Sequence, residues 1–405
     1  MTATTPDIAT AAARTPAGFR MLLRLLASNW AIGRLTVRLP NGEDHELRGA
    51  RPGPAAVLII KDYAFAKRVL ASGDIGFAEG YMADEWDTPH LAGLLEVLAR
   101  NYDGIVRLFH GNALMQAVHW IRHRLNRNSR QGARRNIHAH YDLGNPFYEA
   151  WLDRTMTYSS AVFETKDETL EAAQTRKYRK LAEAMDLKAG HRVLEIGCGW
   201  GGFAEYAARE VGAHVTGITI SAEQHAYASR RLADAGLSDR VDIQLIDYRD
   251  VQGRFDRVAS IEMFEAVGQE YWPAYFDKIR QVLVPDGRAA LQIITIADAF
   301  FGGYDKRTDF IQKYVFPGGM LPSEAVLKPV VEGAGLAWTA AERFGHSYAE
   351  TLKRWDERFT AAWSRIQPLG FDERFRRLWR FYLAYCEAGF RAERIDVIQL
   401  SLKRA

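Results

Sequence analysis

The second half of the chain alternates short apolar stretches with helical stretches, and this pattern limits the fold more than any other feature. Strands that are apolar on both faces belong inside a sheet covered by helices on both sides, as parallel sheets are. A further apolar stretch over 396–402 predicts a closing strand. The pattern predicts an α/β fold with a parallel sheet. Its predicted strands are residues 191–197, 215–220, 241–246, 256–261 and 288–293.

Length and composition narrow the class of protein. A chain of 405 residues exceeds what one core usually supports, so we expect two domains. Its 48% hydrophobic and 25% charged residues exclude a largely disordered chain. Two cysteines can form neither a disulfide framework nor a zinc ribbon. We find no spanning apolar run and no secretory signal pattern, so a cytoplasmic protein is expected.

The first part of the chain predicts a small α+β domain. A short amphipathic helix is expected over 16–33, strands over 35–39 and 57–60, and helices over about 62–72 and 88–125.

Residues 121–138 carry six arginines and no acidic residue. This segment is either a solvated linker or a basic strap for the phosphate groups of lipid or nucleic acid. No heptad zipper or zinc-finger spacing lies nearby, which favours lipid. Nearby His138 and His140 lack partners at ligand spacing, so no metal site is expected.

The strongest local signal is the glycine-rich loop Glu195–Gly202, between a predicted strand and a predicted helix. Glycines allow a tight turn and close approach to a ligand at the carboxyl end of a strand. The loop satisfies both G-x-G and G-x-G-x-x-G, so spacing alone does not exclude a nicotinamide cofactor. Thr219 and Gln224 stand where a dinucleotide site usually has an acid. Asp247 beside Tyr248 suits an adenine ring.

Residues 136–402 resemble the cyclopropane fatty acid synthase family of S-adenosylmethionine-dependent methyltransferases. The resemblance implies a Rossmann-like, seven-stranded class I methyltransferase domain behind a smaller N-terminal α+β domain. We divide the chain into a lipid- or membrane-docking domain (1–120), a basic linker (121–140) and the methyltransferase domain (141–405). The matching stretches are Tyr141–Tyr148, Met156–Ala161, Glu195–Gly202, Ile218–Gln224, Ser260–Gly268, Phe316–Pro322 and Tyr382–Phe390.

The resemblance implies a set of contacts with S-adenosylmethionine. Tyr158 and Ser159 would close over its methionine end. The loop glycines would face its carboxylate and ribose, two polar side chains would serve the ribose, and an aromatic ring would serve the adenine. In that order these are Gly197, Gly199 and Gly201, then Thr219 and Gln224, then Tyr248.

The implied reaction is methyl transfer to the cis double bond of unsaturated phospholipid acyl chains, forming a cyclopropane ring. In the family a bicarbonate ion is the base, held by a glutamate, a tyrosine, a histidine and a cysteine-bearing turn. Glu265 and Tyr348 match the first two, and the turn has Ser160. The histidine position falls on Gln292, which cannot carry a charge. Cys386 is a further catalytic candidate, or simply a packed thiol.

Other functions stay open at this point. Because of Gln292, the cation left on the chain has a second fate, a hydride shift that gives a methylene or methyl-branched product. A small-amine N-methyltransferase and a non-catalytic lipid carrier are weaker alternatives. The resemblance also implies a homodimer, peripheral on the anionic inner face of a membrane. No nucleic-acid partner is expected.

Overall fold

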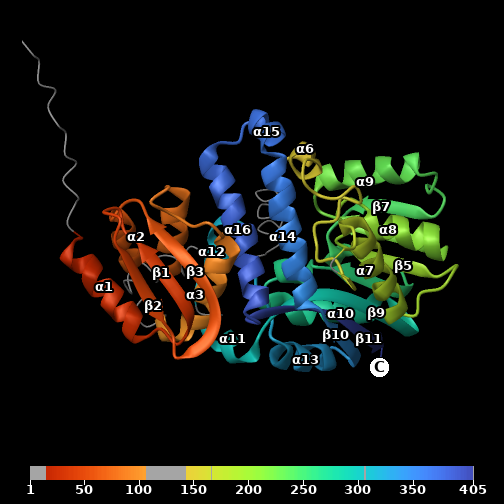
Figure 1. Ribbon diagram of the computed structural model, residues 1–405. Helices are drawn as coiled ribbons and strands as arrows, with labels where there is room; N and C mark the ends of the chain where they lie inside the picture. Colours follow the sequence, from red (N-terminus) through yellow and green to blue (C-terminus); the bar gives the residue numbers. More distant parts are fainter. Residues whose placement is uncertain (1–14, 106–142, 166, 305–306, 405) are drawn as a thin grey trace, which may run out of the picture. The chain divides into compact units, whose positions relative to one another are not determined.

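The chain forms two compact units, Met1–Met115 and Gln116–Ala405. The computed structural model describes residues 15–105, 143–165, 167–304 and 307–404 (Figure 1). The arginine-rich segment 121–138, with His138, and His140 lie outside the described residues. The docking domain and the basic linker therefore stay predictions.

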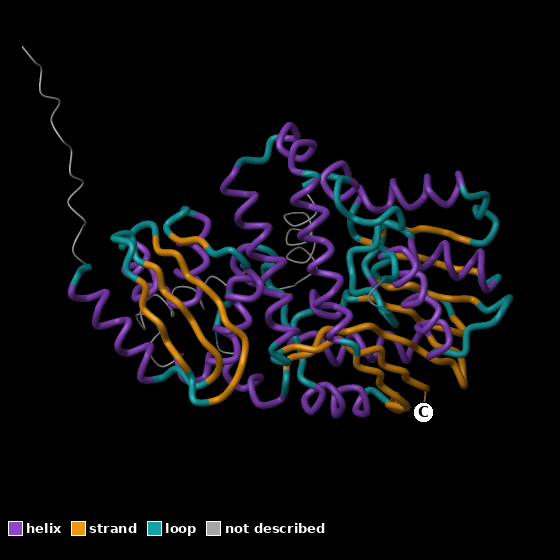
Figure 2. The backbone as a smooth tube through the Cα atoms, in the orientation of Figure 1, coloured by secondary structure: helices purple, strands orange, loops and turns teal. Residues whose placement is uncertain are grey.

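The first unit is a small α+β domain built on a four-stranded sheet of order β2-β1-β3-β4 (Figure 2). Helix α3 packs against β1 and β3. Two of its strands, β2 and β4, escaped the sequence analysis because β2 is mostly exposed and β4 is very short. Its elements are α1 (Ala17–Ser28), β1 (Ile32–Arg38), β2 (Asp44–Arg48), β3 (Arg51–Ile60), α2 (Ala64–Met82), β4 (Trp86–Asp87) and α3 (Leu91–Ile105).

A buried asparagine joins helix α3 to the sheet of this unit. The side chain of Asn101 on α3 accepts hydrogen bonds from the N–H groups of Ala31 (2.8 Å) and Ile32 (2.9 Å). Its amide donates to the carbonyls of Ile32 and Val97, both at 2.9 Å. All four hydrogen-bonding positions of the amide are thus used where β1 begins.

The second unit contains a seven-stranded sheet of order β10-β11-β9-β8-β5-β6-β7. Its strands from β9 through β7 are parallel, whereas β11 runs antiparallel to β9 and to β10. Every predicted strand of this half is present, and the α/β class is confirmed. The strands are β5 (Arg192–Ile196), β6 (His214–Thr219), β7 (Val241–Leu245), β8 (Phe255–Ile261), β9 (Leu283–Ile296), β10 (Leu336–Arg343) and β11 (Ile395–Arg404).

Alternate residues of each strand feed two separate cores. Val193 and Ala259 pack on one face with Leu232 and Phe203, from helices on that side. Their neighbours Leu194 and Val258 pack on the other face. This period of two explains why the strands look apolar throughout. The first face is covered by α7 (Leu170–Ala184), α8 (Gly202–Tyr206) and α9 (Ala222–Asp234), and the second by α10 (Trp272–Val282) and α13 (Glu324–Gly333).

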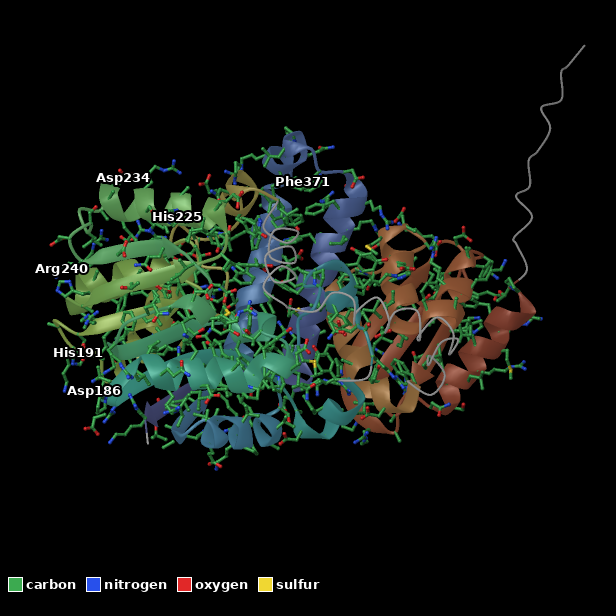
Figure 3. All side chains as sticks on the ribbon, turned by 180° about the vertical axis from the view of Figure 1, so that it is seen from behind. Asp186, His191, His225, Asp234, Arg240 and Phe371 are labelled. Atoms are coloured by element: carbon green, nitrogen blue, oxygen red, sulfur yellow. The ribbon has the colours of Figure 1, made fainter. Side chains whose placement is uncertain are left out.

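Helices α14 and α16 pack on each other near the carboxyl ends of the strands (Figure 1). Asp186, His191 and Arg240 mark the opposite edge, where β5 and β7 begin (Figure 3). Among the described helices none is both long and apolar enough to cross a membrane. The remaining helices are α6 (Asn145–Glu149), α11 (Asp298–Tyr304), α12 (Phe310–Tyr314), α14 (Gly345–Ala361), α15 (Trp363–Ile366) and α16 (Glu373–Arg391), with short helical turns at Ala207–Val211, Tyr248–Asp250, Phe264–Ala266, Gln269–Tyr271 and Gln367–Leu369.

We predict that Asn101→Ala loosens the first unit, because two buried N–H groups lose their acceptor. The expected cost is about 2 kcal/mol or more of unfolding free energy. Amide hydrogen exchange at Ala31 and Ile32 measures it. Asn29→Ala is the control, since the exposed Asn29 amide bonds only Leu25 and Ser28. Equal exchange in the two variants would contradict the prediction.

Candidate active site

The glycine loop turns at the carboxyl end of β5. Gly197, Gly199 and Gly201 all have positive φ, at 81°, 52° and 84°. A Cβ on Gly197 would lie 2.7 Å from Met263 Cγ, whereas a Cβ on Gly199 would meet no atom within 4 Å. The loop therefore packs tightly against Met263 at Gly197 and leaves open space at Gly199. Such an open, glycine-lined backbone at the end of a strand fits a bound nucleoside cofactor.

The neighbouring strand supplies the expected polar pair. Thr219 ends β6, and its hydroxyl donates to Gln224 Oε1 at 2.9 Å. Both side chains are buried, and Ser221 caps the intervening start of α9 by accepting from the Gln224 N–H. Thr219 and Gln224 thus come together at the end of the strand next to the glycine loop, and their contact with the cofactor stays a prediction.

Tyr248 follows β7 and is half-buried. Burial raises the pKa of its phenol to about 12, so it stays neutral. Its ring lies edge-on to Tyr275, with centroids 5.3 Å apart. Asp247 immediately precedes Tyr248. Its carboxylate accepts two hydrogen bonds from the Arg249 guanidinium, at 2.8 and 2.7 Å. A neutral aromatic face at the end of this strand suits an adenine ring.

Tyr158 and Ser159 lie in a turn held by several long-range bonds. The Tyr158 hydroxyl lies 2.8 Å from that of Tyr382 on α16. The Ser159 hydroxyl accepts from Lys177 Nζ at 2.7 Å, and its carbonyl accepts from Gln174 at 2.9 Å. Lys177 is fully buried on α7, and this burial lowers its pKa to about 7.

Glu262 is the centre of the site, and sequence analysis did not single it out. Its Oε1 accepts from the Ser160 N–H at 2.8 Å and from Gln292 Nε2 at 2.7 Å. Its Oε2 accepts from the Tyr348 hydroxyl at 2.6 Å. Burial raises the pKa of Glu262, against the opposing pull of these donors. Ser160, Gln292 and Tyr348 were predicted site residues, and the structure brings them together on Glu262.

Strand register explains this convergence. Ile261 at the end of β8 pairs with Gln292 of β9, so Glu262 follows directly beside that glutamine. On the other side of β9, Gln399 of β11 pairs with Gln292. Gln399 Nε2 donates to Gln292 Oε1 at 3.1 Å. Because its oxygen is used in this way, the Gln292 amide directs its N–H₂ group toward Glu262.

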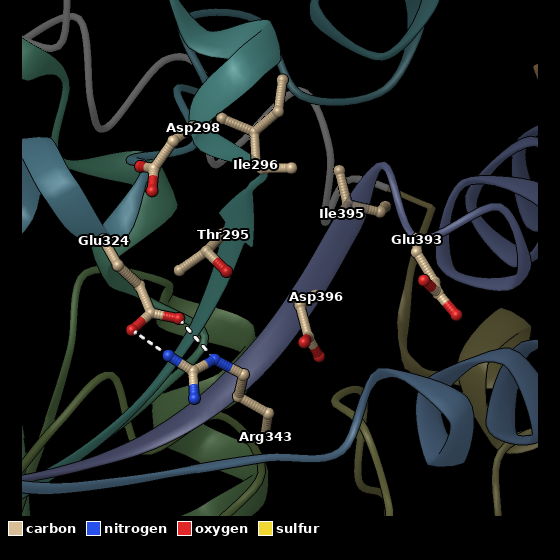
Figure 4. A pocket seen from close by; sticks show the side chains of 9 residues that line it. Thr295, Ile296, Asp298, Glu324, Arg343, Glu393, Ile395 and Asp396 are labelled. Carbon is tan, nitrogen blue, oxygen red and sulfur yellow. Dashed lines mark hydrogen bonds and ion pairs between the residues drawn. The ribbon is translucent and has the colours of Figure 1, made fainter.

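Tyr348 is positioned by the start of α14. Asp396 Oδ1 on β11 accepts from the Gly345 N–H at 2.8 Å, which fixes the first turn of that helix. The Tyr348 ring stacks on Phe390 with centroids 4.5 Å apart. Asp396 also lines a hollow of about 340 Å³, beside the Arg343–Glu324 ion pair (Figure 4). The residues that line this hollow do not include the Glu262 cluster.

Glu265 was assigned to the bicarbonate ion together with Ser160, Gln292 and Tyr348, but the hydrogen bonds of those three residues go to Glu262 instead. Its Oε1 accepts from the Ile294 N–H at 2.5 Å. Within the described part of the chain, its buried Oε2 has no hydrogen-bond partner. Burial, reinforced by the charge of Glu262, raises the pKa of Glu265 to about 8. This carboxyl group is therefore largely protonated at neutral pH.

Cys386 lies on α16 and fits a packing role. Burial raises the pKa of its thiol above the ordinary value, and Asp309 and Glu262 add to that shift. A protonated thiol is a weak nucleophile and a weak base. Its catalytic assignment stays a prediction without support from the surroundings.

Several functional side chains were missed because their signal is spatial rather than sequential. Glu262 stands three residues before Glu265, within the stretch Ser260–Gly268 that resembles the family, but its side chain has no role there that the resemblance implies. Lys177 lies in an ordinary helical pattern on α7, and Gln399 lies in an ordinary strand pattern on β11. Only burial identifies Lys177, and only strand pairing identifies Gln399. Among the described residues, no group of three or more His, Cys, Asp and Glu could hold a metal.

Comparisons with known proteins identify the family of the chain. The family model described as mycolic acid cyclopropane synthetase matches residues 128–400. The chain belongs to this family. It is an S-adenosylmethionine-dependent methyltransferase, and the resemblance found in its sequence is confirmed.

Individual relatives support the assignment over nearly the whole chain. Tuberculostearic acid methyltransferase UfaA1 of Mycobacterium tuberculosis is 41% identical, over 97% of this chain and 92% of its own. Cyclopropane-fatty-acyl-phospholipid synthase of Escherichia coli is 36% identical, over 88% of this chain and 90% of its own. The mycolic acid cyclopropane synthase CmaA1, solved with SAH and CTAB, is 30% identical with a TM-score of 0.63, over 67% of this chain and 98% of its own.

We predict that Gly199→Ala lowers affinity for S-adenosylmethionine by at least about tenfold, or 1.4 kcal/mol. The new Cβ would stand in the open space of the loop, at a φ of +52°. Gly236→Ala is the matched control, since Gly236 has φ +70° and equally open surroundings after α9. Calorimetric titration should show a loss only in the first variant. Equal affinities would place the cofactor elsewhere.

We predict that Glu265→Gln changes how stability depends on pH. A folded-state pKa of about 8, above the ordinary glutamate value of 4.5, means that the folded protein holds this proton more tightly than the unfolded chain does. The resulting stability is complete below pH 4.5 and is lost as the pH rises toward 8. Wild type should therefore lose more stability than Glu265→Gln between these limits. Urea unfolding across this range tests it, and parallel curves would refute the assigned pKa.

Proposed function

We propose that the protein transfers the methyl group of S-adenosylmethionine to the cis double bond of an unsaturated phospholipid acyl chain. The observation that carries the proposal is the buried carboxylate of Glu262 beside the cofactor turn. Its donor Ser160 follows Tyr158 and Ser159 directly, so an acid–base group adjoins the expected methionine end. An alkylated double bond needs a base at that place.

Bound S-adenosylmethionine would supply an electrophilic sulfonium methyl group. Attack by the double bond leaves a carbocation on the acyl chain, which the protein must shield from water. The ring of Tyr158 lies 5.4, 5.7 and 5.3 Å from those of Tyr148, Trp151 and Trp355. Electron-rich aromatic faces stabilise a nearby cation without reacting with it. This aromatic group supports a cationic intermediate.

The expected bicarbonate ion does not fit this donor set. The resemblance assigned the Ser160 turn, Gln292 and Tyr348 to the ion, yet all three donate to Glu262. A second anion on the same donors would face strong repulsion at close range. We therefore derive no step through bicarbonate.

Two products are compatible with the proposal. Loss of a proton from the new methyl group closes a cyclopropane ring, which is the product the sequence resemblance implies. A hydride shift before proton loss gives a methylene group. Gln292 in place of a histidine favours this second product, as does the 41% identity to a tuberculostearic acid methyltransferase. A saturated methyl branch would need a later two-electron reduction by another enzyme.

The acceptor and its location follow from the same proposal. A phospholipid acyl chain requires contact with a membrane, and the arginines of 121–138 would supply attraction to its anionic surface. We propose a peripheral enzyme on the inner face of the membrane, acting as a homodimer. A small-amine acceptor would not need the arginine-rich segment.

We predict that the protein moves labelled methyl groups from S-adenosylmethionine into vesicles of unsaturated phospholipid, and not into saturated ones. Gas chromatography with mass spectrometry of the released acyl chains identifies the product. Ozone cleaves a methylene group and leaves a cyclopropane ring intact, so it separates the two outcomes. Gly199→Ala, assayed with S-adenosylmethionine below saturation, serves as the low-activity control. Label found only in small amines, or in no lipid, would refute the proposed function.

A further inference from the structure

We infer that Glu262 is the general base of this enzyme and takes the place of a bicarbonate ion. The inference rests on the proposed function and adds the residue that completes the reaction. Glu262 touches the expected cofactor turn through Ser160, and it joins that turn to strand β9 and helix α14. No other described carboxylate makes this set of contacts.

The surroundings of Glu262 suit an ionised carboxylate. Ser160 N–H, the Gln292 amide and the Tyr348 hydroxyl all donate to it. Hydrogen bonds to the charged form of an acid favour that form. The direction of the Gln292 donor is fixed, because Gln399 occupies its carbonyl oxygen. Two of the three groups, the Ser160 N–H and the Gln292 amide, can therefore only donate to Glu262.

A side-chain carboxylate reproduces what the ion would offer. Both are planar, carry a single negative charge and present two acceptor oxygens to the same donors. The chain-borne group has one advantage, since it is already in place and loses no translational freedom on binding. Ser160, Gln292 and Tyr348, which were expected to bind a diffusible ion, therefore hydrogen-bond to the Glu262 side chain instead.

Backbone geometry marks the same position. Glu262 has φ +49°, a left-handed conformation that residues with a side chain rarely adopt. Its N–H donates to the Gln292 carbonyl at 2.8 Å, which keeps it next to β9. Strain of this kind persists where the surrounding structure fixes it, and it is common at active sites. The conformation directs the carboxylate off the end of β8 toward Tyr348.

Charged and titratable groups from each neighbouring element act on Glu262. Lys177 from α7 is the buried cation, and Glu265 in the following turn is an acid whose pKa the charge of Glu262 helps to raise. Tyr348 from α14 and Cys386 from α16 are neutral, since burial raises the pKa of both. Burial also raises the pKa of Glu262, which makes it a stronger base than an exposed glutamate.

The proposed step balances without an added oxidant or reductant. The π electron pair of the double bond forms the new C–C bond to the methyl group, and the pair of the broken C–S bond stays on sulfur. Glu262 then takes a proton from the methylated chain. The electron pair of that C–H bond closes the ring, or forms the methylene double bond after a hydride shift. Solvent later removes the proton from Glu262.

Two variants at Glu262 test the inference with full-length protein and unsaturated vesicles. Glu262→Gln keeps the shape but cannot accept the proton, so turnover should fall about a hundredfold or more. Glu262→Gly relieves the positive φ and opens space beside the same donors. Its turnover should fall similarly and recover when bicarbonate or propionate is added. Both variants should bind S-adenosylmethionine as wild type does.

The same assay separates the inference from the proposed function. Wild-type turnover should be unchanged in carbon dioxide-free buffer and should fall as the pH drops through the raised pKa of Glu262. Glu332→Gln, an exposed exchange on α13, is the control. No methyl transfer to lipid by wild type would refute the function itself. A bicarbonate requirement in wild type, near-normal turnover of Glu262→Gln, or no rescue of Glu262→Gly would overturn the inference alone.

Discussion

The pairing of β8, β9 and β11 is the constraint on which the site depends. Ile261 faces Gln292, and Gln292 faces Gln399, in one continuous ladder of backbone hydrogen bonds. A shift of either register by one residue would turn a glutamine side chain to the other face of the sheet. Glu262 would then lose its amide donor. The chemistry is thus tied to strand register rather than to a flexible loop.

The sequence predicted the large-scale architecture well, and the physical reason is burial. Strands covered on both faces must be apolar throughout, so their pattern stands out from the rest of the chain. The edge strand β10 was missed because most of its side chains are at least partly exposed. The glycine loop was also predictable, since positive φ at Gly197, Gly199 and Gly201 restricts the residue type.

The centre of the candidate site was only half predictable. Ser160, Gln292 and Tyr348 could be placed by resemblance, but the group they serve could not. A resemblance assigns a role only to a residue at a matching position. It therefore assigned the family's site glutamate to Glu265. Glu262 meets those donors from a left-handed conformation directly after β8. That conformation has no signature in composition or periodicity.

The position of β11 in the sheet has a consequence for how the enzyme is made. It lies between β9 and β10, although it follows both in the chain. A ribosome therefore releases the glycine loop, Glu262 and Tyr348 before Gln399 and Asp396 exist to orient them. During synthesis, the cofactor loop can form before the base has its final supports. The hydrogen bonds that Gln399 and Asp396 make to the site can form only once this strand has been inserted between β9 and β10.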